Sequence, residues 1–259
     1  MPAPRTSRLV RARRLVIAAL AGLLLGIGAL WTVTTIATPR RTTPLYDPPV
    51  LAGQQIPGYC SGGVYARHGD AIVLTSSPHC RGEGTVVGDQ GVVGPMAQDP
   101  TCPHVGYTCH ASDMNYLVVA ADRIPWGHLN VIDLGVGGYR ILDPDAKPLG
   151  CDEVAIGDPT EVDGRNIYRT GIVVGKGENL QPPAQDGSYF PCMIVSTIQV
   201  GGGDSGSVVL VRGAPAGVTS RTFGGNLGFT PLAEGLADLG LDLCTTPDCG
   251  LVPPVDEVR

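Results

Sequence analysis

From Cys60 onward, the chain consists of short apolar runs separated by glycine, proline and aspartate. Runs of this length between turn residues are typical of antiparallel strands joined by hairpins, and not of helices. The 37 glycines and 23 prolines fit the many turns of such a fold. We expect strands at 71–75, 85–87, 91–93, 116–120 and 129–134, and then at 153–156, 166–174, 193–200, 207–211, 216–219 and 227–230. The pattern predicts an all-β domain over 60–259.

One stretch near the C-terminus breaks this pattern. Thr230 is a suitable capping residue, Pro231 suits the first helical position, and three leucines fall on one face of a helix over 231–239. These leucines are Leu232, Leu236 and Leu239. We expect a short C-terminal helix that buries them.

The N-terminus has the pattern of a membrane segment. Residues 1–14 are basic, and residues 15–37 carry no charge and would form a helix of roughly 34 Å, enough for a bilayer of about 30 Å. The basic flank places 1–14 in the cytoplasm. The apolar run is longer than that of a secretory signal, which favours an uncleaved transmembrane anchor, with a signal cleaved near 36–38 as the alternative. Residues 38–59 are rich in proline and predict an extended tether.

All eight cysteines follow the apolar segment, which predicts folding in an oxidising space outside the cytoplasm. Short separations favour the pairs Cys102 with Cys109 and Cys244 with Cys249. A metal site is the alternative for the first pair, because His104 and His110 lie beside these cysteines. The spacing matches no standard zinc pattern, so we expect a disulfide, with no metal and no cofactor.

The stretch 201–207 has the local chemistry of a nucleophile. Ser205 lies among glycines, follows an acidic residue and precedes the apolar run 208–211, although such clusters also form ordinary turns. A serine hydroxyl needs an imidazole to accept its proton and a carboxylate to orient that imidazole. Of the five histidines, only His79 ends a convincing strand, and Cys80 follows it directly.

These motifs resemble the chymotrypsin-like serine proteases, and most closely the bacterial streptogrisin and alpha-lytic type. The resemblance rests on Cys60-Ser61-Gly62-Gly63-Val64, on the strand ending in Ser77-Pro78-His79-Cys80, and on the segment around Ser205. It implies two six-stranded antiparallel barrels packed around a cleft, with a similar short C-terminal helix. It also implies that His79 is the general base, that Ser205 is the nucleophile and that Cys60 pairs with Cys80. Cys151 and Cys192 are then left for each other.

In this family the aspartate of the triad directly precedes an apolar strand. Asp113, before the run 114–119, is the best match, and Asp122, Asp133 and Asp99 are the alternatives. His79 and Asp113 would then lie on the first barrel and Ser205 on the second.

The resemblance also implies the remaining parts of the site. The N–H groups of Gly203 and Ser205 would form the oxyanion hole. Residues 217–220 resemble the strand that pairs with the substrate backbone, which makes Thr219 and Ser220 substrate-binding residues. Gln199 and Val200 would lie at the floor of the specificity pocket, where the lack of an acidic residue favours uncharged substrate side chains.

Three positions depart from the family pattern. Pro78 replaces a small residue before the histidine, Ser207 replaces a glycine, and Gly201 replaces a common cysteine. The alternative to an enzyme is therefore an inactive, protease-like binding or scaffold domain at the cell surface.

The sequence thus predicts a monomeric serine endopeptidase outside the cytoplasm that acts on a peptide or protein through an acyl-enzyme. It would be held at the membrane by its N-terminal helix or secreted. The net charge of −6, with no basic run outside the leader, argues against nucleic acid as a partner. An α/β-hydrolase is also disfavoured, because His79 precedes Ser205 and a strand follows Ser207.

Overall fold

The computed structural model describes the residues 51–56, 60–80, 108–110, 112–119, 121–164, 168–180 and 188–253. The predictions for the basic segment 1–14, the apolar segment 15–37, most of the tether 38–59 and the strands 85–87 and 91–93 lie outside these residues. Within the described part of the chain, no helix is both long and apolar enough to cross a membrane.

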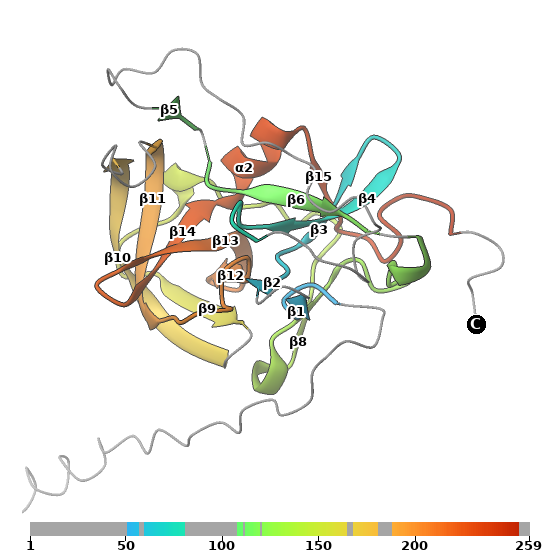
Figure 1. Cartoon of the computed structure of the whole chain (residues 1–259). Coiled ribbons are helices and arrows are strands. Elements are labelled where there is room, and N and C mark those ends of the chain that lie inside the picture. Colours follow the sequence, from blue (N-terminus) through green and yellow to red (C-terminus); the bar gives the residue numbers. More distant parts are fainter. Residues whose placement is uncertain are drawn as a thin grey trace, which may run out of the picture. The chain divides into compact units, whose positions relative to one another are not determined.

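The second half of the chain forms a closed antiparallel barrel (Figure 1). Its strands are β9 (Pro159–Asp163), β10 (Tyr168–Leu180), β11 (Ser188–Gln199), β12 (Val208–Val211), β13 (Ala214–Phe223) and β14 (Asn226–Pro231). They follow the order β10-β9-β12-β13-β14-β11, and a further pairing of β10 with β11 closes the ring. The prediction of a six-stranded barrel in this half is confirmed.

The first half is built from smaller sheets. Its strands are β1 (Gln55–Ile56), β2 (Cys60–Ser61), β3 (Tyr65–His68), β4 (Ala71–Ser76), β5 (Thr108–Cys109), β6 (Asn115–Val118), β7 (Val131–Asp133) and β8 (Tyr139–Ile141). β3, β4 and β6 form one sheet with β15 (Asp242–Leu243), while β1 pairs with β2, β7 pairs with β8, and β5 joins β11. The resemblance implied a barrel in this half as well, and among the described residues these strands do not close into one.

The apolar cores of the two halves meet at β12. All four residues of this strand are buried, and because side chains alternate along a strand, they divide between two clusters. Val208 and Leu210 pack with the first-half sheet, whereas Val209 and Val211 pack inside the barrel. The strand that follows Ser205 is therefore buried on both faces, which gives this loop a rigid base.

Several local predictions were wrong in detail. The expected strand at 153–156 is replaced by the 3-10 turn η3 (Cys151–Glu153). Two further 3-10 turns among the described residues are η1 (Ala121–Arg123) and η2 (Gly135–Gly137). β9 was missed because it begins with Pro159, a residue that is tolerated at the start of a strand but weakens the strand signal.

The C-terminal helix is confirmed as α2 (Leu232–Leu239), which begins one residue later than expected. Pro231 is its N-cap, with φ −62° and ψ 138°, and Thr230 belongs to β14. The helix buries Leu232, Leu236 and Leu239 as predicted. Gly240 ends it in the left-handed conformation, which glycine adopts without steric cost.

Candidate active site

His79 lies in a tight turn directly after β4. The N–H of Cys80 donates to the carbonyl of Ser77 over 2.8 Å, which closes the turn around Pro78 and His79. Pro78 occupies the second position of this turn, where its fixed φ is favourable. The departure from the family pattern at Pro78 is therefore accommodated by the local backbone.

One disulfide and the hydrogen bonds of the neighbouring Ser61 join this turn to the loop that carries Ser205. Cys80 pairs with Cys60, and the two Cα atoms lie 5.8 Å apart. Next to Cys60, the N–H of Ser61 donates to the carbonyl of Ser205 over 2.8 Å. The Ser61 hydroxyl also donates to the carbonyl of Gly203 over 2.9 Å, and the Sγ of Cys80 lies 3.6 Å from the backbone carbonyl oxygen of Ser205. The predicted base and nucleophile are thus carried by adjoining loops.

The backbone after Ser205 is held on the other side by β13. The N–H of Gly206 donates to the carbonyl of Thr219 over 2.7 Å, and the N–H of Thr219 donates to the carbonyl of Ser207 over 2.8 Å. The Ser207 hydroxyl donates to the carbonyl of Asp204 over 2.6 Å. Ser207 is therefore a structural part of the loop, which explains how a serine fits where the family has glycine.

Gly206 is required by both conformation and space. Its φ is +87°, in the region that favours glycine. A Cβ at this position would overlap the carbonyl oxygen of Ser61 and lie 2.5 Å from the Ser76 hydroxyl. The close approach of the Ser205 loop to the first half of the chain thus depends on the missing side chain.

The two N–H groups predicted for the oxyanion hole belong to the loop that carries Ser205. Gly203 adopts φ +99°, and Ser205 is half-buried. Among the described residues, neither the Gly203 N–H nor the Ser205 N–H donates a hydrogen bond to the protein. Backbone N–H groups without a protein acceptor are the kind of donor that an oxyanion hole uses.

Asp113 lies next to the His79 turn. It precedes β6, which pairs with β4 so that Asn115 lies opposite Ser76. Asp113 is 4% exposed, and its N–H donates to the Thr230 hydroxyl over 3.2 Å. β-sheet pairing therefore brings Asp113 and His79 to the same end of two neighbouring strands.

The alternative aspartates lie elsewhere. Asp133 is on β7, where its carboxylate accepts hydrogen bonds from the Gln54 side chain over 2.6 Å and from the Gly135 N–H over 2.7 Å. Asp122 belongs to η1, and Asp99 lies outside the described residues. Of the two candidates whose side chains the structure describes, Asp113 and Asp133, Asp113 is the one whose charge acts on His79.

The hydrogen bonds of a triad are not formed in this arrangement. The Nδ1 atom of His79 lies 2.9 Å from the Ser77 hydroxyl, and the Nε of Arg221 donates to the Asp113 carboxylate over 2.6 Å. Within the described part of the chain, no hydrogen bond joins His79 to Asp113 or to Ser205. His79 and Asp113 are neighbours with other partners.

The electrostatics of His79 reflect this arrangement. Although the imidazole reaches solvent, the protein atoms around one side of it lower its pKa below the usual 6.5. The Asp113 carboxylate raises the pKa, and the Arg221 guanidinium lowers it. The two charges therefore act on the base in opposite directions.

Arg221 and Ser77 are site residues that the sequence reasoning missed. Arg221 directly follows Ser220 on β13, and its guanidinium carbon lies 4.8 Å from the centre of the Phe190 ring. His110, the alternative metal ligand, is buried beside the same ring, with ring centres 5.7 Å apart. The described residues contain no group of three or more side chains that could hold a metal.

The predicted substrate-binding residues fall into two groups. Thr219 and Ser220 are buried and lie beside the Ser205 loop, with the Ser220 hydroxyl 3.9 Å from the sulfur of Met193. Gln199, at the end of β11, is exposed and donates to the Asn226 side chain, while the N–H of Val200 donates to the carbonyl of Gly225 over 3.3 Å. Gln199 and Val200 therefore contact the turn that joins β13 to β14.

The other disulfides agree with the expected pairs. Cys151 pairs with Cys192, and Cys244 pairs with Cys249, with Cα distances of 6.2 and 4.6 Å. The pairing of Cys102 with Cys109 stays a prediction, because Cys102 lies outside the described residues.

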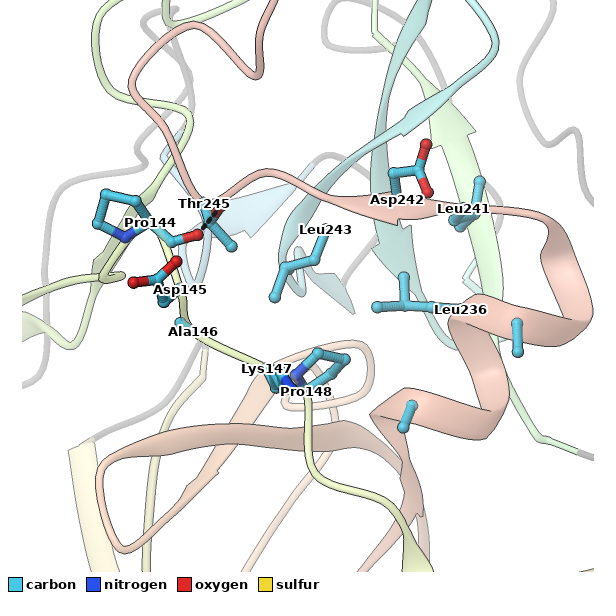
Figure 2. A pocket seen from close by; sticks show the side chains of 12 residues that line it. Pro144, Asp145, Ala146, Lys147, Pro148, Leu236, Leu241, Asp242, Leu243 and Thr245 are labelled. Carbon is cyan, nitrogen blue, oxygen red and sulfur yellow. Dashed lines mark hydrogen bonds between the residues drawn. The ribbon is translucent and has the colours of Figure 1, made fainter.

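A hollow of about 780 Å³ lies away from this chemistry (Figure 2). It is bounded by the segment 144–148, by α2 and by residues 241–245, and Leu236 and Leu243 project into it. The Thr245 hydroxyl donates to the Pro144 carbonyl over 2.9 Å at its edge. Since none of the predicted site residues lines this hollow, we do not assign it to the active site.

Comparison with solved structures identifies the fold, whereas no protein-family model and no curated protein matches the chain. A glutamic-acid-specific serine protease, described as using a histidine triad in substrate binding, aligns at 20% identity and TM-score 0.54, over 75% of this chain and 100% of its own. The chymotrypsin of Cellulomonas bogoriensis aligns at 19% identity and TM-score 0.54, over 76% of this chain and 99% of its own. The alpha-lytic protease homolog N4 aligns at 16% identity and TM-score 0.50, over 74% of this chain and 98% of its own. The chain has the chymotrypsin-like fold of the bacterial streptogrisin and alpha-lytic type, as the resemblance predicted.

Proposed function

We propose that this chain is a serine endopeptidase with Ser205 as nucleophile, His79 as general base and Asp113 as the carboxylate that orients His79. The observation that carries the proposal is the joining of two distant loops. Ser61 binds the carbonyls of Gly203 and Ser205, and the disulfide beside it holds the His79 turn. The N–H groups of Gly203 and Ser205, which have no protein acceptor among the described residues, support the proposal as donors for an oxyanion.

In the proposed reaction, the Ser205 oxygen bonds to the carbonyl carbon of the peptide while the imidazole of His79 takes the hydroxyl proton. The N–H groups of Gly203 and Ser205 bind the resulting oxyanion. Collapse of this intermediate breaks the C–N bond, and His79 gives its proton to the leaving amine. Water, activated by the same imidazole, then releases the acyl group from Ser205.

The substrate would lie along β13, with its backbone beside Thr219 and Ser220. Gln199 and Val200 carry no charge, so we expect a preference for uncharged side chains. We further propose that the chain acts outside the cytoplasm as a monomer, tethered by 15–37 or released from it, with the two halves forming paired barrels around the cleft. The three disulfides among the described residues support an oxidising compartment.

A binding or scaffold domain is the second candidate. It is favoured by the hydrogen bonds of His79 to Ser77 and of Asp113 to Arg221, which leave the bonds of the triad unformed. Such a domain would bind a peptide along β13 without cleaving it.

The test is covalent labelling of the full chain, purified in detergent, with a fluorophosphonate probe. We expect labelling that Ser205→Ala and His79→Ala abolish, because the probe reacts with a serine only when a base activates it. His128→Ala is the matched control, since His128 is exposed and lies outside the site. A folded, disulfide-bonded chain that is not labelled, or is labelled equally in Ser205→Ala, would contradict the enzyme.

A further inference from the structure

We propose that Arg221 is a positioning residue that holds Asp113 away from His79, so that the described arrangement is a latent state of the site. The inference rests on the proposed function. We call the ion pair between Arg221 and Asp113 the Arg221 latch.

The first step is the strength of the latch. The Asp113 side chain is 6% exposed and that of Arg221 is 20% exposed, and their N–O distance is 2.6 Å. A hydrogen bond between two charged groups at this distance and burial is among the stronger polar contacts in a protein. A carboxylate that is engaged in this way cannot also give full support to a developing imidazolium.

The second step is that the backbone of β13 aims Arg221 at Asp113. The pairing of β13 with β14 shifts register between Thr219 and Arg221, which places a β-bulge at Ser220. Bulges redirect the next side chain and are frequent beside active sites. The Phe190 ring then supports the guanidinium through a cation–π contact. Arg221 is therefore held between an aromatic face and the carboxylate.

The third step is the partner of His79. Its Nδ1 atom, which a triad aspartate would bind, lies 2.9 Å from the Ser77 hydroxyl instead. Ser77 is fully buried, and its carbonyl closes the turn that carries His79. In the proposed activation, the bond from Arg221 to Asp113 and the bond between Ser77 and His79 are both replaced by a bond between His79 and Asp113.

The fourth step is the location of the latch on the proposed substrate strand. Arg221 is one residue beyond Ser220, so a peptide that pairs with β13 contacts the backbone of the residue that holds Asp113. Asp113 and Arg221 are the charged groups of the described chain that act on His79, and they do so with opposite sign. When Arg221 releases Asp113, the influence that lowers the His79 pKa weakens and the influence that raises it strengthens, so both changes raise this pKa.

The test compares the full chain with Arg221→Met, which removes the charge but keeps an extended side chain against Phe190. We expect the rate constant of fluorophosphonate labelling to rise about tenfold, in the range that a better-supported base provides. The pKa of His79, measured by NMR on ¹⁵N-labelled imidazole, should rise in the same variant. Asp113→Asn in the Arg221→Met background should reverse both changes. Arg67→Met is the matched control, because Arg67 pairs with Asp242 at the surface, and it should change neither.

Unchanged labelling and an unchanged His79 pKa in Arg221→Met would overturn the latch. Slower labelling with a fixed pKa would also overturn it, because it would assign Arg221 a supporting role. Should Arg221→Met fail to fold, Arg221→Lys provides the test, since lysine keeps the charge but loses the planar donor geometry. We expect a smaller gain in that variant, and no gain would refute the latch.

The two proposals fail in different ways. If Ser205 is unreactive in every variant while the His79 pKa moves as expected, the latch stands and the nucleophilic function falls. If the wild type is labelled as fast as Arg221→Met, the function stands and the latch falls.

Discussion

The Ser205 loop and the pair of His79 and Asp113 are assembled to different degrees. The loop is fixed by backbone hydrogen bonds to Ser61 and Thr219 and carries the two N–H groups that we propose as oxyanion donors. The side chains of His79 and Asp113 are close but engaged with Ser77 and Arg221. The difference teaches that the backbone part of a site can be complete while its proton-transfer part is set by a few side chains.

The largest expected effect comes from breaking the backbone part at Gly206. Gly206→Ala adds a Cβ that overlaps the Ser61 carbonyl at a φ of +87°. We expect the free energy of unfolding to fall by about 2 to 4 kcal/mol, and labelling of Ser205 to fall about a hundredfold, because the oxyanion donors move. Urea unfolding and probe labelling measure the two effects.

Gly213→Ala is the control for Gly206→Ala. Its φ is +78°, but no atom lies within 4 Å of the added Cβ, so it shares the backbone strain without the overlap. We expect a cost of about 1 kcal/mol and little change in labelling. Equal losses of labelling in the two variants would show that the contact with Ser61 does not matter.

A second way to break the backbone part is to remove the disulfide between Cys60 and Cys80. The double variant Cys60→Ser with Cys80→Ser opens a loop with a sequence separation of 20, and should cost about 3 kcal/mol in unfolding free energy. It should also slow labelling more than tenfold, because the His79 turn is no longer joined to Ser61.

The pair Cys244 and Cys249, with a separation of 5, is the matched control for that disulfide. Its removal should cost about 2 kcal/mol and leave labelling unchanged, since it lies outside the site. If removal of either disulfide slowed labelling equally, the Cys60–Cys80 disulfide would support labelling only through the general stability of the fold, and not by joining the His79 turn to Ser61.

The sequence was informative where a motif lies on a short, rigid segment. His79, Asp113 and Ser205 could be placed because each adjoins a strand whose apolar run is plain, and the second barrel follows from such runs. The small sheets of the first half could not be predicted, because β15 comes from residues near the C-terminus and two-residue strands have no pattern of their own. β9 could not be predicted, because Pro159 at its start weakens the strand pattern.

Arg221 and Ser77 could not be predicted as partners of the site for a different reason. The sequence does not show which way the side chain of Arg221 points, because that direction depends on the bulge at Ser220. Ser77 was seen only as part of the histidine motif, since a hydroxyl two residues from an imidazole is common. The departures at Pro78 and Ser207 were visible in the sequence, but their accommodation depended on hydrogen bonds between backbone atoms.

The smallest expected effect concerns the side-chain part and its dependence on pH. His79 must be neutral to accept the Ser205 proton, so the labelling rate should rise with pH through the pKa of His79 and then level off. Because enclosure by the protein is the largest influence and lowers this pKa, the midpoint should lie below pH 6.5.

The same reasoning ranks two influences on the pKa of His79, enclosure by the protein and the charge of Asp113. Asp113 raises the His79 pKa and enclosure outweighs it, so Asp113→Asn should move the midpoint further down, while the slower labelling of this variant can still be followed at high probe concentration. The pH-dependent limb should vanish in His79→Ala, where any residual labelling lacks this base. A midpoint above pH 6.5 in the wild type would mean that Asp113 already dominates the environment of His79, as it would in a fully formed triad. That outcome would remove the contrast between the assembled loop and the unassembled pair, because both parts would then be ready for catalysis.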